Sequence, residues 1–144
     1  MNDITVLTFK IVLSIFLSSV IGLEREFRQK GAGLRTHILV AVGSTLVVLT
    51  SFSIFDQYNK IIAIDPTRMI TGILQGIGFL CGGAIIRSGS SVHGLTTAAT
   101  LWIVSGIGIA VGTGLYEISV IVTLCVLFTL IFVRKIEYRM PKKT

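Results

Sequence analysis

Charged residues form a short run directly after the first apolar stretch of the sequence. The run occupies residues 24–28, and the spacing of Glu24 and Arg28 allows an ion pair along one helix. Charges close to a membrane are tolerated when they are paired or reach water. We expect Glu24 to pair with an arginine from another segment, either Arg35 or Arg87. The alternative is that these charges form surface ion pairs and contact lipid phosphates.

A wider polar cluster is predicted from residues in several segments. Asp65 and Arg68 precede an apolar stretch, and we expect them at the membrane face opposite to Glu24. The predicted cluster comprises Glu24, Arg25, Glu26, Arg35, Arg87, Asp65 and Arg68. Because Mg²⁺ keeps several waters and needs only one or two carboxylates, Mg²⁺ binding stays possible. The sequence assigns no residue as a metal ligand.

Combinations of residues that enzymes use are missing from the sequence. It contains no paired carboxylates for acid–base chemistry, no nucleophile beside a base and no metal motif. His37 and His93 are not spaced like zinc ligands, so we expect them on the surface or in polar networks. The sequence therefore predicts a protein that is not an enzyme and has no cofactor, with Mg²⁺ the one possibility left open.

Glycines recur at intervals of four residues, which places both members of a pair on one helix face. Small residues at that spacing let helix backbones approach closely in lipid. Tight helix packing is one interpretation, and a flexible or unwound centre at a binding site is the other. The glycines predicted to pack are Gly72, Gly76, Gly78, Gly82, Gly108 and Gly112.

The elements that carry these residues follow from the composition. The chain has 144 residues, of which 52% are hydrophobic and only 14% charged, and its mean hydropathy is +0.86. A soluble chain of this size cannot bury so much apolar surface. The formal net charge is +6, and in a membrane protein such an excess of Lys and Arg is typical of loops on the cytoplasmic side. The basic residues are not interleaved with aromatic residues, so the charge does not indicate nucleic-acid binding. The composition predicts an all-α membrane protein that crosses the bilayer several times.

Five transmembrane helices nearly use up the chain, because each needs about 20 residues. A flexible joint with a hydroxyl cap is expected at residues 94–97, before the fourth helix, and Asp65-Pro66 is expected to start the third. The spans contain no Asp or Glu away from their ends, which argues against a conventional ion pump. The predicted helices cover residues 4–23, 37–55, 69–86, 97–111 and 116–133, and a basic tail covers residues 134–144.

Basic residues predict the orientation of these helices. Ten of the 13 Lys and Arg residues fall in the first loop, the third loop and the tail. Cytoplasmic loops carry such an excess, so the N-terminus is predicted outside and the C-terminus in the cytoplasm. Lys10 lies inside the first helix, within reach of water at its outer end.

Several motifs, in this order, resemble the MgtC/SapB family of bacterial membrane proteins. The resemblance covers roughly residues 15 to 115 and includes a first signature in residues 22–26 and 32–37, then residues 65–68. A long central signature follows in residues 76–102, where Leu80-Cys81-Gly82-Gly83 replaces the frequent Leu-Gly-Ala-Gly. The central residues that carry the match are Gly94, Thr96, Thr97 and Trp102.

The resemblance implies a multi-pass protein of the bacterial plasma membrane with a role in magnesium homeostasis or adaptation to low magnesium. It implies contact with membrane lipid, and we expect a homo-oligomer that acts on other membrane proteins. We expect a non-enzymatic regulatory or binding protein; the alternative is a transporter of magnesium or another ion. Longer members carry a C-terminal cytosolic domain of the ACT-like type, which a chain ending at Thr144 is expected to lack.

Overall fold

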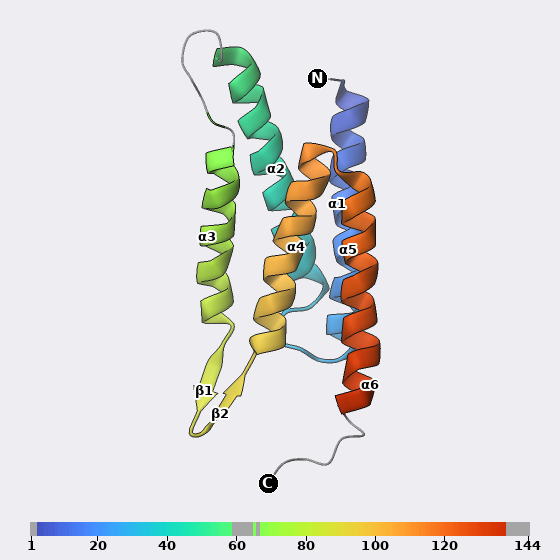
Figure 1. Cartoon of the computed structure of the whole chain (residues 1–144), viewed down its shortest axis with the longest axis vertical. Helices are drawn as coiled ribbons and strands as arrows, with labels where there is room; N and C mark the ends of the chain where they lie inside the picture. The colour runs from blue at the N-terminus through green and yellow to red at the C-terminus, as the bar shows by residue number, and fades with distance from the viewer. Residues whose placement is uncertain (1–2, 59–64, 66, 138–144) are drawn as a thin grey trace.

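The computed structural model describes residues 3–58, 65 and 67–137 of the chain. Within them, five main helices run alternately up and down (Figure 1), so the predicted all-α class is confirmed. The fifth helix continues through a π-helical turn into one further short helix. The helical elements are α1 (Ile4–Phe27), α2 (Leu34–Tyr58), α3 (Thr67–Gly83), α4 (Leu95–Thr113), α5 (Tyr116–Phe128), η1 (Thr129–Val133) and α6 (Arg134–Glu137).

Helix α4 lies in the middle of the bundle and contacts all four of the other main helices. Its strongest packing is against α2, and α1 packs against both, while α3 and α5 flank the group (Figure 1). Burial of apolar side chains between α1, α2, α4 and α5 forms the main core. The buried members of this core are Leu17, Ile21, Ala41, Val104, Ile107, Val111, Val126 and Leu130.

Four helical stretches in the described part of the chain are long and apolar enough to cross a membrane. They are α1, α2, α4 and the continuous run Tyr116–Ile136. Helix α3 has 17 residues, which gives a length of about 26 Å at the rise of an α-helix. It lies alongside α4 (Figure 1), and large apolar side chains such as Phe79 face outward, as residues in contact with lipid do.

The two ends of the bundle differ in what they carry. The hairpin end consists of residues 28–33, 84–94 and 134–137, and the N-terminal end consists of residues 3–5, 56–58, 65, 67–68 and 114–115. Because the number of main helices in the described residues is odd, α1 begins at one end and α5 finishes at the other (Figure 1).

A short β-hairpin replaces the predicted end of the third helix. Helix α3 stops at Gly83, and strands β1 (Ile86–Ser88) and β2 (Ser91–His93) pair antiparallel. The turn contains Gly89 with φ +60°, a backbone conformation that favours glycine. The prediction that helix three reaches residue 86 is therefore wrong, because the chain there forms strand hydrogen bonds instead.

Helices α1, α2 and α4 are longer than predicted. Helix α1 ends at Phe27 rather than residue 23, α2 covers Leu34–Tyr58, and α4 covers Leu95–Thr113. Hydropathy patterns stop at the first charged residues, whereas a helix continues as long as its backbone groups find partners. The predicted tail also begins inside a helix, α6, and its residues 138–144 lie outside the described residues, as do Lys60 and Pro66.

Candidate functional site

Helices α2 and α4 approach each other so closely that only glycine fits on the α4 side. A Cβ atom at Gly108 would overlap the carbonyl oxygen of Ala41. A Cβ atom at Gly112, one helical turn further, would lie 2.9 Å from the Cβ atom of Val48. The spacing of Gly108 and Gly112 therefore places both at this contact, as small residues are used in membrane helices.

Close backbone contact lets buried hydroxyl groups bridge the helices. Thr45 is fully buried, and its Oγ1 lies 3.0 Å from Ser14 Oγ of α1 and 2.9 Å from the carbonyl oxygen of Gly108. A hydroxyl has a single hydrogen, so it donates to one of these oxygens at a time. Thr45 thereby links α1, α2 and α4 in the centre of the bundle.

His37 forms a second buried bridge, nearer the hairpin end. Its Nδ1 lies 2.8 Å from the carbonyl oxygen of Gly33, and its Nε2 lies 3.2 Å from Oγ1 of Thr100 in α4. A carbonyl oxygen only accepts, so the neutral ring carries its proton on Nδ1 and Nε2 is an acceptor. The single hydroxyl hydrogen of Thr100 serves either Nε2 or the carbonyl oxygen of Thr97, which lies 2.9 Å from Oγ1. The side chain is fully buried, which agrees with the predicted polar-network role.

Two buried cations lie near opposite ends of the bundle, with these hydrogen-bonded residues between them. Lys10, near the N-terminal end, is 6% exposed, and its Nζ donates to the carbonyl oxygen of Gly112 at 2.8 Å. Arg25, near the hairpin end, is 2% exposed. We call this set of side chains the polar core: Lys10, Ser14, Arg25, His37, Thr45 and Thr100.

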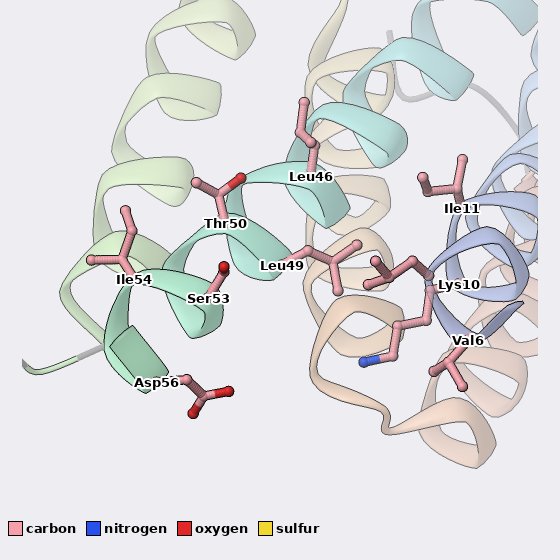
Figure 2. A pocket seen from close by; sticks show the side chains of 10 residues that line it. Val6, Lys10, Ile11, Leu46, Leu49, Thr50, Ser53, Ile54 and Asp56 are labelled. Atoms are coloured by element: carbon pink, nitrogen blue, oxygen red, sulfur yellow. The ribbon is translucent and has the colours of Figure 1, made fainter. Parts of the chain in front are cut away.

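A cavity of about 410 Å³ opens beside Lys10 at the N-terminal end. Figure 2 shows Lys10 of α1 on one side of it and Asp56 of α2 on the other, with apolar residues such as Leu49 between them. The carboxylate of Asp56 makes no ion pair within 4 Å among the described residues. The partner of the lysine is instead the carbonyl oxygen of Gly112 at the end of α4, where the helix dipole is negative.

The charged run at the end of α1 forms contacts within its own segment. Glu24 pairs with Arg25 and with Arg28, whose Nε lies 3.3 Å from Glu24 Oε1. Contrary to the prediction, Glu24 pairs with neither Arg35 nor Arg87 among the described residues. Neighbours one and four positions away on the same helix reach the carboxylate first.

Glu26 binds backbone rather than an arginine. Its Oε2 accepts a hydrogen bond from the N–H of Leu34 at 3.0 Å, at the first residue of α2. A Cβ atom on Gly33 would overlap this oxygen, so the glycine leaves room for it. Glu26 therefore satisfies one of the free N–H groups at the start of α2.

The two remaining arginines at the hairpin end lie apart. Arg87 is exposed in β1 and donates from Nε to the carbonyl oxygen of Gly89 at 3.3 Å. Arg35 is in the first turn of α2 and lines a groove between α2 and α3. The structure thus brings Glu24 and Arg25 together but places Arg35 and Arg87 in other surroundings.

Asp65 and Arg68 lie at the N-terminal end of the bundle, whereas Glu24 lies near the hairpin end. Asp65 Oδ1 accepts from the N–H of Thr67 at 2.9 Å and from its hydroxyl at 2.6 Å. These hydrogen bonds hold the pKa of the exposed Asp65 carboxyl below its ordinary value. Asp65 therefore acts as a cap at the start of α3.

The glycines of α3 have open space where a side chain would begin, as far as the described residues go. A Cβ atom at Gly72, Gly76, Gly78 or Gly82 would meet no described atom within 4 Å. Gly72 and Gly76 instead line the groove between α2 and α3, which has a volume of about 540 Å³. The predicted helix contacts through these four residues are therefore not made inside the described chain.

Residues of the central motif begin α4. Gly94 is its N-cap, with φ +89°, and no side chain caps the helix, so the expected hydroxyl cap is wrong. Thr96 and Thr97 lie in the first turn, and Thr97 is buried. Trp102 is 47% exposed on the side of α4 that faces α5.

Comparison with known proteins identifies the family. The sequence profile of the MgtC family matches residues 11–139. The chain belongs to the MgtC family. No solved structure matches the chain.

Three relatives illustrate how far the similarity of this MgtC family member extends. The putative magnesium transporter YhiD of Escherichia coli K12 is 33% identical over 136 residues, covering 93% of this chain and 63% of YhiD. The uncharacterized protein slr0014 of Synechocystis is 39% identical over 128 residues, covering 89% and 52%. Protein MgtC of Salmonella typhimurium LT2 is 38% identical over 129 residues, covering 90% and 53%.

This chain spans between half and two thirds of the length of those relatives. The relatives and the long apolar helices together make this MgtC family member a multi-pass bacterial membrane protein.

Sequence reasoning identified three of the six members of the polar core of this MgtC family member and missed the other three. Lys10, Arg25 and His37 stand out in the sequence as charged or titratable residues, and Lys10 is conspicuous because it interrupts an apolar stretch. The hydroxyl residues Ser14, Thr45 and Thr100 lie in apolar stretches and carry no signal of a polar contact. Their burial depends on how three helices pack, which spacing alone does not reveal.

Proposed function

We propose that this MgtC family protein is a non-enzymatic regulatory or binding protein of the bacterial membrane, linked to magnesium homeostasis. Membership of the family and the names of its relatives, one of them a putative magnesium transporter, support the link to magnesium. The proposed role is to act on partners within the bilayer rather than to carry Mg²⁺ itself.

Two buried cations carry this proposal. A divalent cation that entered between α1, α2 and α4 would approach Arg25 near one end and Lys10 near the other. Repulsion between like charges is strong where water is excluded. Glu24 pairs with Arg25 and offsets part of its charge, whereas Lys10 makes no ion pair among the described residues. The interior groups between the two cations in the described chain are hydroxyls, a histidine and backbone carbonyls, which offset the charge of Lys10 little.

Uptake of Mg²⁺ into liposomes that contain only this protein tests the proposal. An indicator inside the vesicles reports entry from a Mg²⁺ gradient, with empty vesicles as the lower control and an added ionophore as the upper one. We expect the protein vesicles to match the empty ones. Saturable uptake that depends on the protein would contradict the proposal.

A magnesium or other ion transporter is the second candidate. The name of YhiD favours it, and so do the oxygen atoms of Ser14 and Thr45 in the interior. If the liposomes take up Mg²⁺, Lys10→Met should then raise the rate, because it removes a buried positive charge beside the cavity at the N-terminal end.

A further inference from the structure

A second cavity, of about 510 Å³, opens at the hairpin end. It lies between the end of α1 and the loop after it, the end of β2 and the start of α4, and the π-helical turn η1 with the first residue of α6. Residues far apart in the sequence thus form one site. Its polar lining residues are Arg25, Lys30, His93, Thr96, Thr97, Thr129 and Arg134.

Positive charge dominates the lining of this cavity. Arg25, Lys30 and Arg134 come from three separate segments, and no Asp or Glu is among the described residues that line it. Arg25 is paired with Glu24, but Nη1 of Arg134 is buried and has no hydrogen-bond partner among the described residues. A buried guanidinium nitrogen without an acceptor is costly, so an acceptor supplied by a ligand would stabilise it.

The start of α4 adds donors to the same cavity. Gly94, its N-cap, has no side chain, and a Cβ atom there would overlap the carbonyl oxygen of Ala84. No side chain therefore caps the first N–H groups of α4, and the hydroxyl-bearing Thr96 and Thr97 of its first turn line the cavity. Uncapped N–H groups and the positive end of the helix dipole favour an anion.

The π-helical turn forms the remaining wall. Thr129, Leu130 and Val133 of η1 line the cavity, and Arg134 follows directly. A π-helical turn is rare and shifts the side chains that follow it around the helix axis. Here it follows α5 at the level of the cavity, immediately before the arginine whose Nη1 has no partner in the described part of the chain.

We propose that this cavity binds a phosphate group. Guanidinium, ammonium, backbone N–H and hydroxyl donors surround the space from several helices, which suits an anion with several oxygens. The cavity lies at the end of the long apolar helices, at the level expected for lipid headgroups. The group belongs either to a membrane lipid or to free phosphate, since both present the same oxygens.

The proposal does not depend on whether the protein regulates or transports. It concerns a site at the hairpin end, whereas Lys10 and the Mg²⁺ experiment concern the interior and the N-terminal end. A negative result in the phosphate-binding experiment therefore does not contradict the proposed function, and a negative result in the Mg²⁺ experiment does not contradict the phosphate site.

Two binding measurements on the purified full chain in detergent test the proposal and separate the two sources. The first is the melting temperature in increasing inorganic phosphate, with ionic strength held constant by KCl. The second is native mass spectrometry with phosphatidylglycerol, compared with diacylglycerol of the same acyl chains, which lacks the phosphate. Both are repeated with Arg134→Gln and with Lys30→Gln, whose exposed side chain is not needed for packing.

Lys135→Gln is the matched control, because Lys135 is an exposed cation next to Arg134 that does not line the cavity. We expect saturable binding of at least one probe, weakened about tenfold by Arg134→Gln or Lys30→Gln, the scale of one charge-assisted hydrogen bond. A response to inorganic phosphate identifies free phosphate, and selective binding of phosphatidylglycerol identifies a lipid.

Binding of neither probe would overturn the proposal. An equal loss in Lys135→Gln and in the two cavity variants would overturn it as well, because it would show attraction to general surface charge.

Discussion

Glu26 shows how a charged run can act on backbone geometry. Its sequence position, in a run of alternating charges, predicts ion pairing, yet its carboxylate accepts from the N–H of Leu34 at 3.0 Å. The eight-residue separation means that the end of α1 directly stabilises the start of α2. The adjacent Gly33 completes the arrangement, because a side chain there would occupy the place of the carboxylate.

Glu26→Ala should lower the free energy of unfolding in detergent by about 1 kcal/mol, the usual cost of losing a helix cap. Glu26→Gln should lose less, because its amide oxygen still accepts a hydrogen bond. Asp56→Ala is the control, since this exposed carboxylate at the other end of α2 makes no side-chain hydrogen bond with the described residues. Chemical unfolding followed by circular dichroism gives the values. Equal values for Glu26→Ala and Asp56→Ala would show that the cap does not contribute.

At the scale of elements, the glycines of α4 differ in whether a side chain would fit at their positions. Gly108 lies against the backbone of α2, whereas a Cβ atom at Gly106 would meet no described atom within 4 Å. Gly108→Ala should therefore cost about 1–3 kcal/mol, the range for overpacking a core. Gly106→Ala should be neutral or slightly stabilising, because alanine favours the helix. Thermal unfolding of the two variants in the same detergent compares them, and a larger loss for Gly106→Ala would contradict the packing described.

We propose that the protein is a homo-oligomer and that α3 packs against a second copy of the chain. Gly78 meets no described atom of its own chain, so Gly78→Leu should leave the melting temperature of the isolated chain nearly unchanged. If α3 packs against a second copy, the larger side chain should reduce the oligomer size measured by light scattering in detergent. Gly106→Ala serves again as the control. An unchanged oligomer size would place Gly78 against lipid.

Hydropathy predicted the five helices because each apolar stretch is long and bounded by charges or turn residues. It did not predict the hairpin at residues 86–93, because two three-residue strands around Gly89 produce no pattern distinguishable from a loop. The partner of Glu24 also could not be chosen from spacing. Distances between segments depend on how α1, α2 and α4 pack, and that packing rests on buried hydroxyls and glycines rather than on the charged residues.

At the scale of the whole molecule, the basic residues are distributed unevenly between the two ends. Most of the described basic residues lie at or beside the hairpin end, whereas Lys10 and Arg68 lie towards the N-terminal end. The proposed phosphate site is therefore on the more positive end of the molecule. Because cytoplasmic loops are rich in Lys and Arg, we propose that the hairpin end faces the cytoplasm and that α1 begins outside.

Single cysteines test this orientation. Cys81→Ser and Cys125→Ser give a cysteine-free background in which a serine hydroxyl can still donate to the carbonyl oxygen of Ala98, as the Cys81 thiol does. Into it, Arg28→Cys, Lys60→Cys and Lys142→Cys are introduced one at a time. An impermeant thiol reagent added to intact cells should label position 60 only, and all three positions after the membrane is opened. Labelling of positions 28 and 142 but not 60 from outside would show that the protein has the opposite orientation. Opposite accessibility of positions 28 and 142 would contradict the arrangement in which the loop after α1 and the end of α6 share one face.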